Sequence, residues 1–228
     1  MKYKGFIFDF DYTLGDSTKG IVISINFGLE YLGFGKAELY DIKKTIGLSL
    51  KNTYQVLTND LKDENAVIFA KKFMEKADEI MVGSTEMLPY SEKLLKRLKE
   101  INLKTGIVTT KLHYQIDRIL NKFNIAEDID LIIGADDVKV EKPDPEGLNA
   151  MIVMMNLKKE EVLYIGDSIV DAETAKRANV DFVAVTTGTT LKEEFENYVC
   201  VDIIADMSKL NYWNSCEEWL LEMLRKVS

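Results

Sequence analysis

The sequence predicts an α/β fold: a doubly wound parallel sheet that carries a separate, all-helical insertion. Two observations support this. Short apolar runs recur along the chain with helical patterns between them, and one long segment, residues 16–85, contains helical patterns only. A short continuous apolar run is typical of a strand buried on both faces, and strands that alternate with helices indicate a parallel sheet. The predicted strands are residues 6–8, 106–108, 131–133, 162–165 and 182–185.

Amphipathic helices are predicted between the strands and at the C-terminus. Their apolar residues recur at spacings of three and four, which place them on one helix face. Ser215 and Glu218 have the spacing of a capping box ahead of the closing helix. The apolar faces contain Leu94, Leu95, Leu98 and Ile101; Ile116, Ile119, Leu120 and Phe123; and, in the closing helix, Leu220, Leu221 and Leu224.

Residues 16–85 are expected to form a small helical domain, which leaves residues 1–15 and 86–228 for the α/β core. One apolar stripe stops at Gly33, a plausible helix end, and shorter helices are expected around residues 39–46 and 53–61. The insertion directly follows the first strand, at whose carboxyl end open α/β sheets bind ligands. The two long stripes consist of Ile21, Ile25, Leu29 and Leu32, and of Phe69, Phe73, Ala77 and Ile80.

Composition narrows the classes of function. The chain has 228 residues, 46% of them hydrophobic, and a net charge of −9 without a basic stripe. We therefore expect neither nucleic acid nor an anionic membrane as a partner. The two cysteines, Cys200 and Cys216, have no metal-like spacing, and no signal peptide or long apolar stretch is seen. These features favour a cytoplasmic location.

Asp9 and Asp11 immediately follow the first predicted strand. Side chains two residues apart point the same way if strand geometry persists. Two carboxylates this close repel each other, so one must be neutralised by a proton or a metal. The pair suits a division of labour between a nucleophile and a proton donor and acceptor. The alternative is a solvated acidic turn.

Thr109 and Thr110 end the second strand, before a helix expected to begin near Lys111. A hydroxyl and unpaired amides at a helix start bind a phosphate oxygen well, although a simple N-cap is the alternative. Lys142 precedes Pro143 in a segment stiffened by prolines, where it suits a fixed positive charge. The alternative for Lys142 is a surface lysine beside a turn.

Asp167 and Asp171 follow the fourth strand and lie four residues apart, so Asp171 can face back toward the loop. Their hard oxygens suit Mg²⁺; alternatively, Asp167 caps the helix and Asp171 favours its dipole. Each of these motifs falls at, or just beyond, the carboxyl end of a different strand, so all would line one crevice. A phosphate dianion beside Asp9 and Asp167 would require the positive charge of Mg²⁺ and Lys142.

With these motifs in this order, the chain resembles the haloacid dehalogenase (HAD) superfamily, in its phosphoglycolate-phosphatase-like branch. The likeness covers nearly the whole sequence, including the spacing of the motifs, the helical insertion, and smaller matches at residues 134–138 and 172–180. It implies a HAD-like Rossmannoid core with strand order 5-4-1-2-3, and an insertion that acts as a cap closing over the substrate.

The resemblance also implies a Mg²⁺-dependent phosphatase that hydrolyses a small phosphate monoester through a phospho-aspartate. Asp9 would be the nucleophile. Asp11 would protonate the leaving oxygen and later activate water. Thr109, with Thr110 beside it, would hold the phosphate, and Lys142 would hold both the phosphate and the nucleophile.

The metal ligands implied by the resemblance are the Asp9 and Asp167 carboxylates and the Asp11 backbone carbonyl. Asp171 would support the site without touching the metal itself. The expected partner is a small-molecule phosphate ester, and the protein is expected to be a monomer or homodimer.

Three residues depart from the family pattern: Tyr12 stands where glycine is usual, Thr110 where asparagine is common, and Asn179 where the helix usually ends in glycine. None of them removes a catalytic group. Tyr12 and Thr110 are positioned to alter the local turn and its hydrogen bonds. Asparagine tolerates left-handed geometry, so Asn179 can replace the glycine.

Two other functions were weighed against hydrolysis. A phosphomutase of the same superfamily remains an alternative, but Leu50 stands where such mutases carry an arginine. A phosphoacceptor signalling module is also an α/β protein with acids and a lysine. It would carry its acceptor on a middle strand and lack the insertion. The dehalogenase branch is disfavoured because Asp11 supplies a proton donor for an oxygen leaving group.

Overall fold

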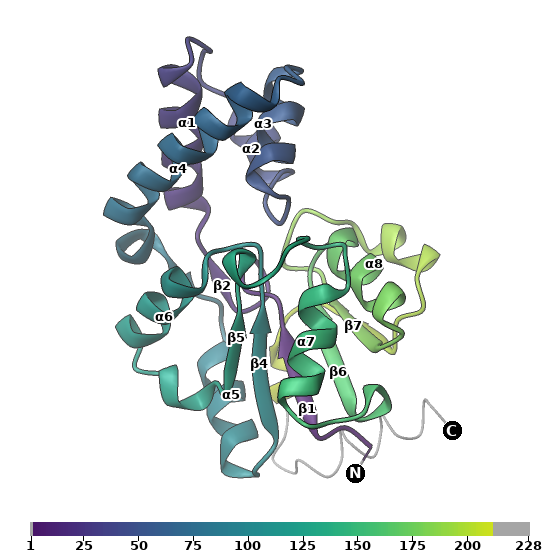
Figure 1. Cartoon of the computed structure of the whole chain (residues 1–228). Coiled ribbons are helices and arrows are strands. Elements are labelled where there is room, and N and C mark those ends of the chain that lie inside the picture. Colours follow the sequence, from purple (N-terminus) through teal and green to yellow (C-terminus); the bar gives the residue numbers. More distant parts are fainter. Residues whose placement is uncertain (1, 212–228) are drawn as a thin grey trace. The chain divides into compact units, whose positions relative to one another are not determined.

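A computed structural model describes residues 2–211 (Figure 1). The chain divides into two compact units. The first contains the residues up to Gly15 and from Met87 onward, and the second is Asp16–Glu86. The closing helix predicted around Ser215 and Glu218, and with it Cys216, lies outside the described residues.

The first unit is built on a six-stranded sheet in which every neighbouring pair of strands is parallel. Its order is β5-β4-β1-β6-β7-β8. The five predicted strands, numbered 1 to 5 in chain order, are β1, β4, β5, β6 and β7. Counted from β7 to β5 they follow the predicted order 5-4-1-2-3, which is thereby confirmed, and β8 adds a strand beyond β7. The added edge strand, β8, was not predicted. The bounds are β1 (Gly5–Phe8), β4 (Lys104–Val108), β5 (Leu131–Ile133), β6 (Val162–Gly166), β7 (Asp181–Val185) and β8 (Asp202–Ile204).

Helices connect the strands and bury their apolar faces against the sheet. Both predicted apolar stripes of the core lie on helices, with Leu94, Leu95 and Leu98 buried in the first and Ile116, Ile119 and Leu120 in the second. Two later helices, α7 and α8, share one apolar cluster with the strands. The helices are α5 (Ser91–Glu100), α6 (His113–Lys122), α7 (Glu146–Met154), α8 (Ile169–Ala178) and the short α9 (Ser208–Asn211).

The second unit is a helical bundle with a core of its own. The two long helices, α1 and α4, pack together, and Gly28 lies so close to the Phe69 ring that a Cβ there would be 2.8 Å from Cδ2. Helix α1 is followed by Gly33 in the left-handed region, with φ +82°, as expected for a helix end. The bounds are α1 (Thr18–Tyr31), α2 (Leu39–Lys43), α3 (Leu50–Thr58) and α4 (Asp63–Ser84).

The chain passes between the units twice. The two passages, β2 (Gly15–Asp16) and β3 (Glu86–Met87), pair with each other as a two-stranded sheet. Among residues 2–211, no helix combines the length and the apolar character that crossing a membrane requires.

Candidate active site

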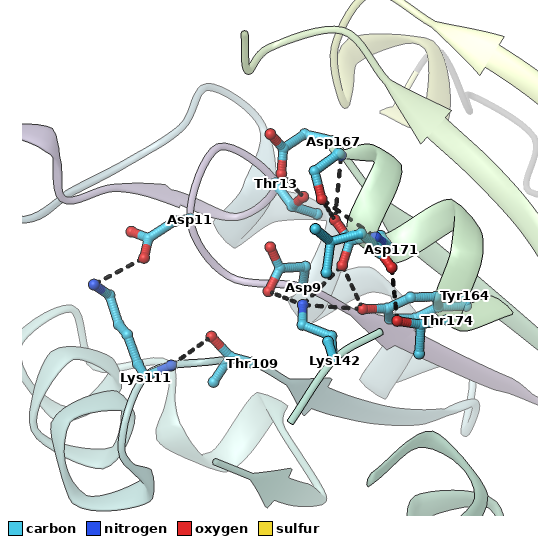
Figure 2. Close-up of polar contacts among 12 residues, drawn as sticks. Asp9, Asp11, Thr13, Thr109, Lys111, Lys142, Tyr164, Asp167, Asp171 and Thr174 are labelled. Atoms are coloured by element: carbon cyan, nitrogen blue, oxygen red, sulfur yellow. Dashed lines mark hydrogen bonds and ion pairs between the residues drawn. The ribbon is translucent and has the colours of Figure 1, made fainter. Parts of the chain in front are cut away.

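The predicted acids and the predicted lysine meet at the carboxyl end of the sheet (Figure 2). Asp9 follows β1, and its backbone N–H donates to the Ile165 carbonyl at 2.9 Å, which continues the ladder with β6. Asp167 and Asp171 follow β6, and Lys142 lies on the segment between β5 and α7. All four side chains are buried. The alternatives of a solvated acidic turn and of a surface lysine are therefore wrong for Asp9 and Lys142.

Lys142 is the charged centre of this cluster. Its Nζ lies 2.8 Å from Asp9 Oδ1 and 2.7 Å from Asp171 Oδ1. The Tyr164 hydroxyl donates to the same Asp171 oxygen at 2.8 Å. Burial disfavours the charge on Lys142, but Asp171 and Asp9 outweigh it and raise the pKa of this lysine well above its usual range. Lys142 is therefore a fixed cation beside the Asp9 carboxylate.

Asp171 is held in place by the start of α8. The N-cap of this helix is Ser168, which exchanges hydrogen bonds with Asp171 in a capping box. The Ser168 hydroxyl donates to Asp171 Oδ2 at 2.5 Å, and its N–H donates to the same oxygen at 3.2 Å. The alternative that Asp167 caps this helix is therefore wrong. Since both oxygens of Asp171 already accept hydrogen bonds, Asp171 suits a supporting position better than a ligand position.

Asp167 is enclosed from two directions. The hydroxyl of Thr13 donates to its Oδ1 at 3.3 Å. On the other side, the backbone of Gly188 comes so close that a Cβ at this position would lie 1.9 Å from Asp167 Oδ2. The orientation of this carboxylate therefore depends on a residue without a side chain.

The cluster fits a divalent cation. Oxygen atoms of Asp9, Asp167 and Asp171 all lie within 4.8 Å of one another. Burial raises the pKa of Asp9 to about 7 although Lys142 opposes the shift, and burial together with the Asp171 charge raises the pKa of Asp167 well above its usual range. One lysine thus leaves these carboxylates short of positive charge. A hard cation held by the Asp9 and Asp167 oxygens would supply it.

Asp11 has a different surrounding. Figure 2 shows its carboxylate turned toward Lys111, with Oδ2 at 2.8 Å from the lysine Nζ. Its other oxygen, Oδ1, is buried and has no hydrogen-bond partner in the part of the chain that the structure describes. The next residue, Tyr12, has a φ of 57°. Tyrosine thus adopts the left-handed geometry that the family's usual glycine reaches without strain.

Thr109 is buried in the turn after β4, and its Oγ1 accepts the backbone N–H of Lys111 at 3.2 Å. A hydroxyl that accepts from an amide still has its own proton to donate, for example to a phosphate oxygen. Helix α6 begins at His113, two residues after the expected start near Lys111, and its N-cap is Leu112, so an N-cap role for Thr109 is wrong. Thr110 lies in the same turn, half-buried, without a side-chain hydrogen bond among the described residues.

Some residues of the site were not singled out from the sequence. Thr13 belongs to the first acidic motif, but its contact with Asp167 depends on the fold. Tyr164 lies inside an apolar run and was interpreted as core. Lys111 and Gly188 lie in loops without a motif, and their partners are distant in the sequence. The only signal for Lys111 was its position two residues after Thr109.

Comparison with known proteins agrees with this geometry. Residues 6–185 match the model of the haloacid dehalogenase-like hydrolase family. The chain is 30% identical over 173 residues to a phosphoglycolate phosphatase from Aquifex aeolicus, covering 75% of this chain and 79% of that protein. It is also 30% identical over 173 residues to a pyrophosphatase PpaX from Listeria monocytogenes, covering 75% and 78%.

A solved structure gives the same result in three dimensions. A haloacid dehalogenase-like hydrolase from Bacteroides fragilis superposes with a TM-score of 0.89 at 39% identity, over 92% of this chain and 100% of that chain. The family model spans the sheet from β1 to β7, and with it each acid and the lysine of the cluster. By its sequence and by its fold, this chain belongs to the haloacid dehalogenase-like hydrolase family.

Proposed function

We propose that the protein is a Mg²⁺-dependent phosphatase that hydrolyses a small phosphate monoester through a phosphorylated Asp9. The observation that carries this proposal is the buried contact of Lys142 with Asp9 at 2.8 Å, beside the Asp167 carboxylate. A buried lysine favours the charged form of one carboxylate and orients it, as a nucleophile requires. Relatives named phosphoglycolate phosphatase and pyrophosphatase further support phosphoryl chemistry.

The reaction has two steps. An Asp9 oxygen forms a bond to phosphorus while the ester oxygen leaves with a proton from Asp11. Water then attacks the phosphorus of the acyl phosphate and loses a proton to Asp11, which releases phosphate and regenerates Asp9. Throughout, the Thr109 hydroxyl donates to a phosphoryl oxygen and Lys142 balances its charge.

The proposed metal ligands are the Asp9 and Asp167 carboxylates and the Asp11 backbone carbonyl, with Asp171 holding Lys142 and the loop in place. These residues would hold Mg²⁺, which would supply positive charge to the phosphoryl group. An oxygen-only set of ligands favours Mg²⁺ among common ions, and Ca²⁺ prefers larger and looser shells. Activity in excess chelator, or full activity with Ca²⁺ alone, would contradict this part of the proposal.

The decisive experiment replaces Asp9 by asparagine. Asp9→Asn should reduce turnover of a generic aryl phosphate to below about 1%, because an amide cannot form the acyl phosphate. Intact-mass spectrometry of the acid-quenched wild type should show a phosphoryl adduct that the variant lacks. Asp117→Asn on α6, where the carboxylate is 53% exposed, is the matched control and should keep full activity. Retained turnover in Asp9→Asn would overturn the proposal.

The identity of the substrate is proposed only as a class. The chain's relatives carry names for a carboxylate-bearing phosphate ester and for pyrophosphate. A screen of small phosphate esters, sugar phosphates, nucleotides and pyrophosphate would discriminate among them. Isomerisation of a sugar monophosphate without release of phosphate would instead favour the phosphomutase alternative, which Leu50 disfavours.

A further inference from the structure

The contact between Lys111 and Asp11 is the second buried ion pair of the site. The Nζ and Oδ2 atoms are 2.8 Å apart, and the two side chains are only 7% and 10% exposed. Figure 2 shows this pair apart from the cluster of Asp9, Lys142 and Asp171. The charge of Lys111 is therefore directed at Asp11.

The pair constrains one oxygen of Asp11 and spares the other. Oδ2 is engaged by Lys111, whereas Oδ1 is buried without a hydrogen-bond partner in residues 2–211. Leaving a buried carboxylate oxygen without a partner is costly unless something else compensates, so such an oxygen needs an explanation. Proton transfer explains why Oδ1 has no partner, because the oxygen that carries the proton must be free of competing hydrogen bonds and must have a defined direction.

The backbone of Lys111 is fixed on both sides. Its N–H donates to Thr109 Oγ1 at 3.2 Å, and its carbonyl accepts from the Ala135 N–H at 2.8 Å. A Cβ at Gly134 would lie 2.8 Å from the Lys111 carbonyl oxygen, so the glycine is what allows the two loops to come this close. The turn that presents the Thr109 hydroxyl thus also fixes the starting point of the lysine side chain.

We propose that Lys111 is a positioning residue for proton transfer, which holds the Asp11 carboxylate so that Oδ1 faces the oxygen that gains or loses the proton. This inference rests on the proposed function. The buried ion pair with Asp11 is the contact through which Lys111 would act. The competing assignment, a direct contact between Lys111 and the phosphoryl group, predicts a different kinetic pattern.

The test compares two phosphate esters that differ in their need for an acid. An aryl ester such as p-nitrophenyl phosphate has a leaving group that departs without much protonation, whereas a simple alkyl phosphate needs the proton. Lys111→Met should lower kcat/KM, which reports formation of the acyl phosphate and not its hydrolysis, by about 100-fold for the alkyl ester and by less than about 10-fold for the aryl ester, since general acid catalysis contributes about 10²–10⁴-fold. KM should not rise by more than about threefold. Lys111→Arg, which keeps the charge, should recover part of the loss.

A double-mutant cycle separates positioning from a structural effect. Once Asp11→Asn has removed the carboxylate, adding Lys111→Met should cause no further loss on either ester. This double variant also removes both buried charges, so it should fold even if an unpaired Asp11 destabilises the single variant. Lys99→Met, which breaks a Lys–Asp pair on the surface at 2.7 Å, is the matched control. It should leave the ratio of the kcat/KM values for the two esters unchanged.

Two results would overturn the inference: equal losses of kcat/KM on both esters, or an effect of Lys111→Met that persists in the Asp11→Asn background. A higher KM with unchanged kcat would also overturn it and would assign Lys111 to binding the phosphate. Failure of the proposed function has a different signature, namely an Asp9→Asn variant that still hydrolyses the aryl ester.

Discussion

At Asp167, a carboxylate lies directly against main chain. The loop after β7 brings Gly188 to a position where any side chain would displace Asp167 Oδ2. In the same loop, the Thr187 hydroxyl donates to the Tyr12 carbonyl in the loop after β1. The loop after β7 thus touches two of the acidic loops, although it contributes no acid itself.

Gly188→Ala should therefore weaken binding of Mg²⁺. The added methyl group forces the Asp167 carboxylate to turn, and displaced supporting contacts typically cost about 10–100-fold in metal affinity. Titration calorimetry with Mg²⁺ measures this directly, without substrate. Gly35→Ala is the control, because a Cβ there meets nothing within 4 Å and the φ of Gly35 is not positive. Unchanged affinity in Gly188→Ala would show that Asp167 does not bind the metal.

Among the helices, the clearest packing constraint lies between α1 and α4. Gly28 of α1 faces the Phe69 ring and the Phe69 carbonyl, with an added Cβ 2.8 and 3.3 Å away. Gly83, near the end of α4, has nothing within 4 Å of such a Cβ. Packing of α1 against α4 therefore requires a glycine at position 28 but not at position 83.

The same substitution at these two glycines should have opposite effects. Gly28→Ala should lower the free energy of unfolding by about 1–3 kcal/mol, because overpacking moves a buried ring and main chain. Gly83→Ala should raise it by up to about 1 kcal/mol, because alanine loses less entropy in a helix. Urea unfolding followed by circular dichroism measures both. A stabilised Gly28→Ala variant would show that α1 and α4 are not packed this closely.

Helices and strands could be predicted from the sequence wherever an apolar pattern was long. Both long helices of the second unit and all five predicted strands are present, and Asn179 has the expected left-handed geometry, with φ 56° after α8. By contrast, β8 was missed, because three residues beginning with Asp202 give no apolar run. Short strands at a sheet edge are defined by their neighbour, and β8 pairs only with β7 among the described strands.

The candidate site was predictable where charges follow strands, and not where partners meet across loops. Asp9, Asp167 and Asp171 were found because their positions after β1 and β6 place them at one edge of the sheet. Lys111 and Gly188 were missed because each is defined by a contact in space, with Asp11 and Asp167 respectively. A single sequence records which residues follow a strand but not which loops touch.

At the scale of the whole molecule, the two units have separate hydrophobic cores, and the residues proposed to bind metal all belong to the first. We therefore expect two unfolding transitions in calorimetry, of which Mg²⁺ raises only one. At about 100 times the dissociation constant, a ligand adds about 2.7 kcal/mol, or about 5–10 °C for a unit of this size. Asp167→Asn should abolish the shift. An equal rise of both transitions would contradict a site built from the first unit alone.

The position of β1 has a consequence for synthesis on the ribosome. This strand is made first, yet it lies inside the sheet, where Gly5 pairs with Lys104 on one side and Val162 on the other. The helical insertion contains both members of its main helix pair, α1 and α4, and is synthesised before β4 and long before β6, the two partners of β1. The apolar β1 therefore stays unpaired until later parts of the chain are made, and long-range pairing of this kind is slow and prone to aggregation. Nascent chains stalled between the end of α4 and the start of β6 should be the ones that chaperones bind most readily.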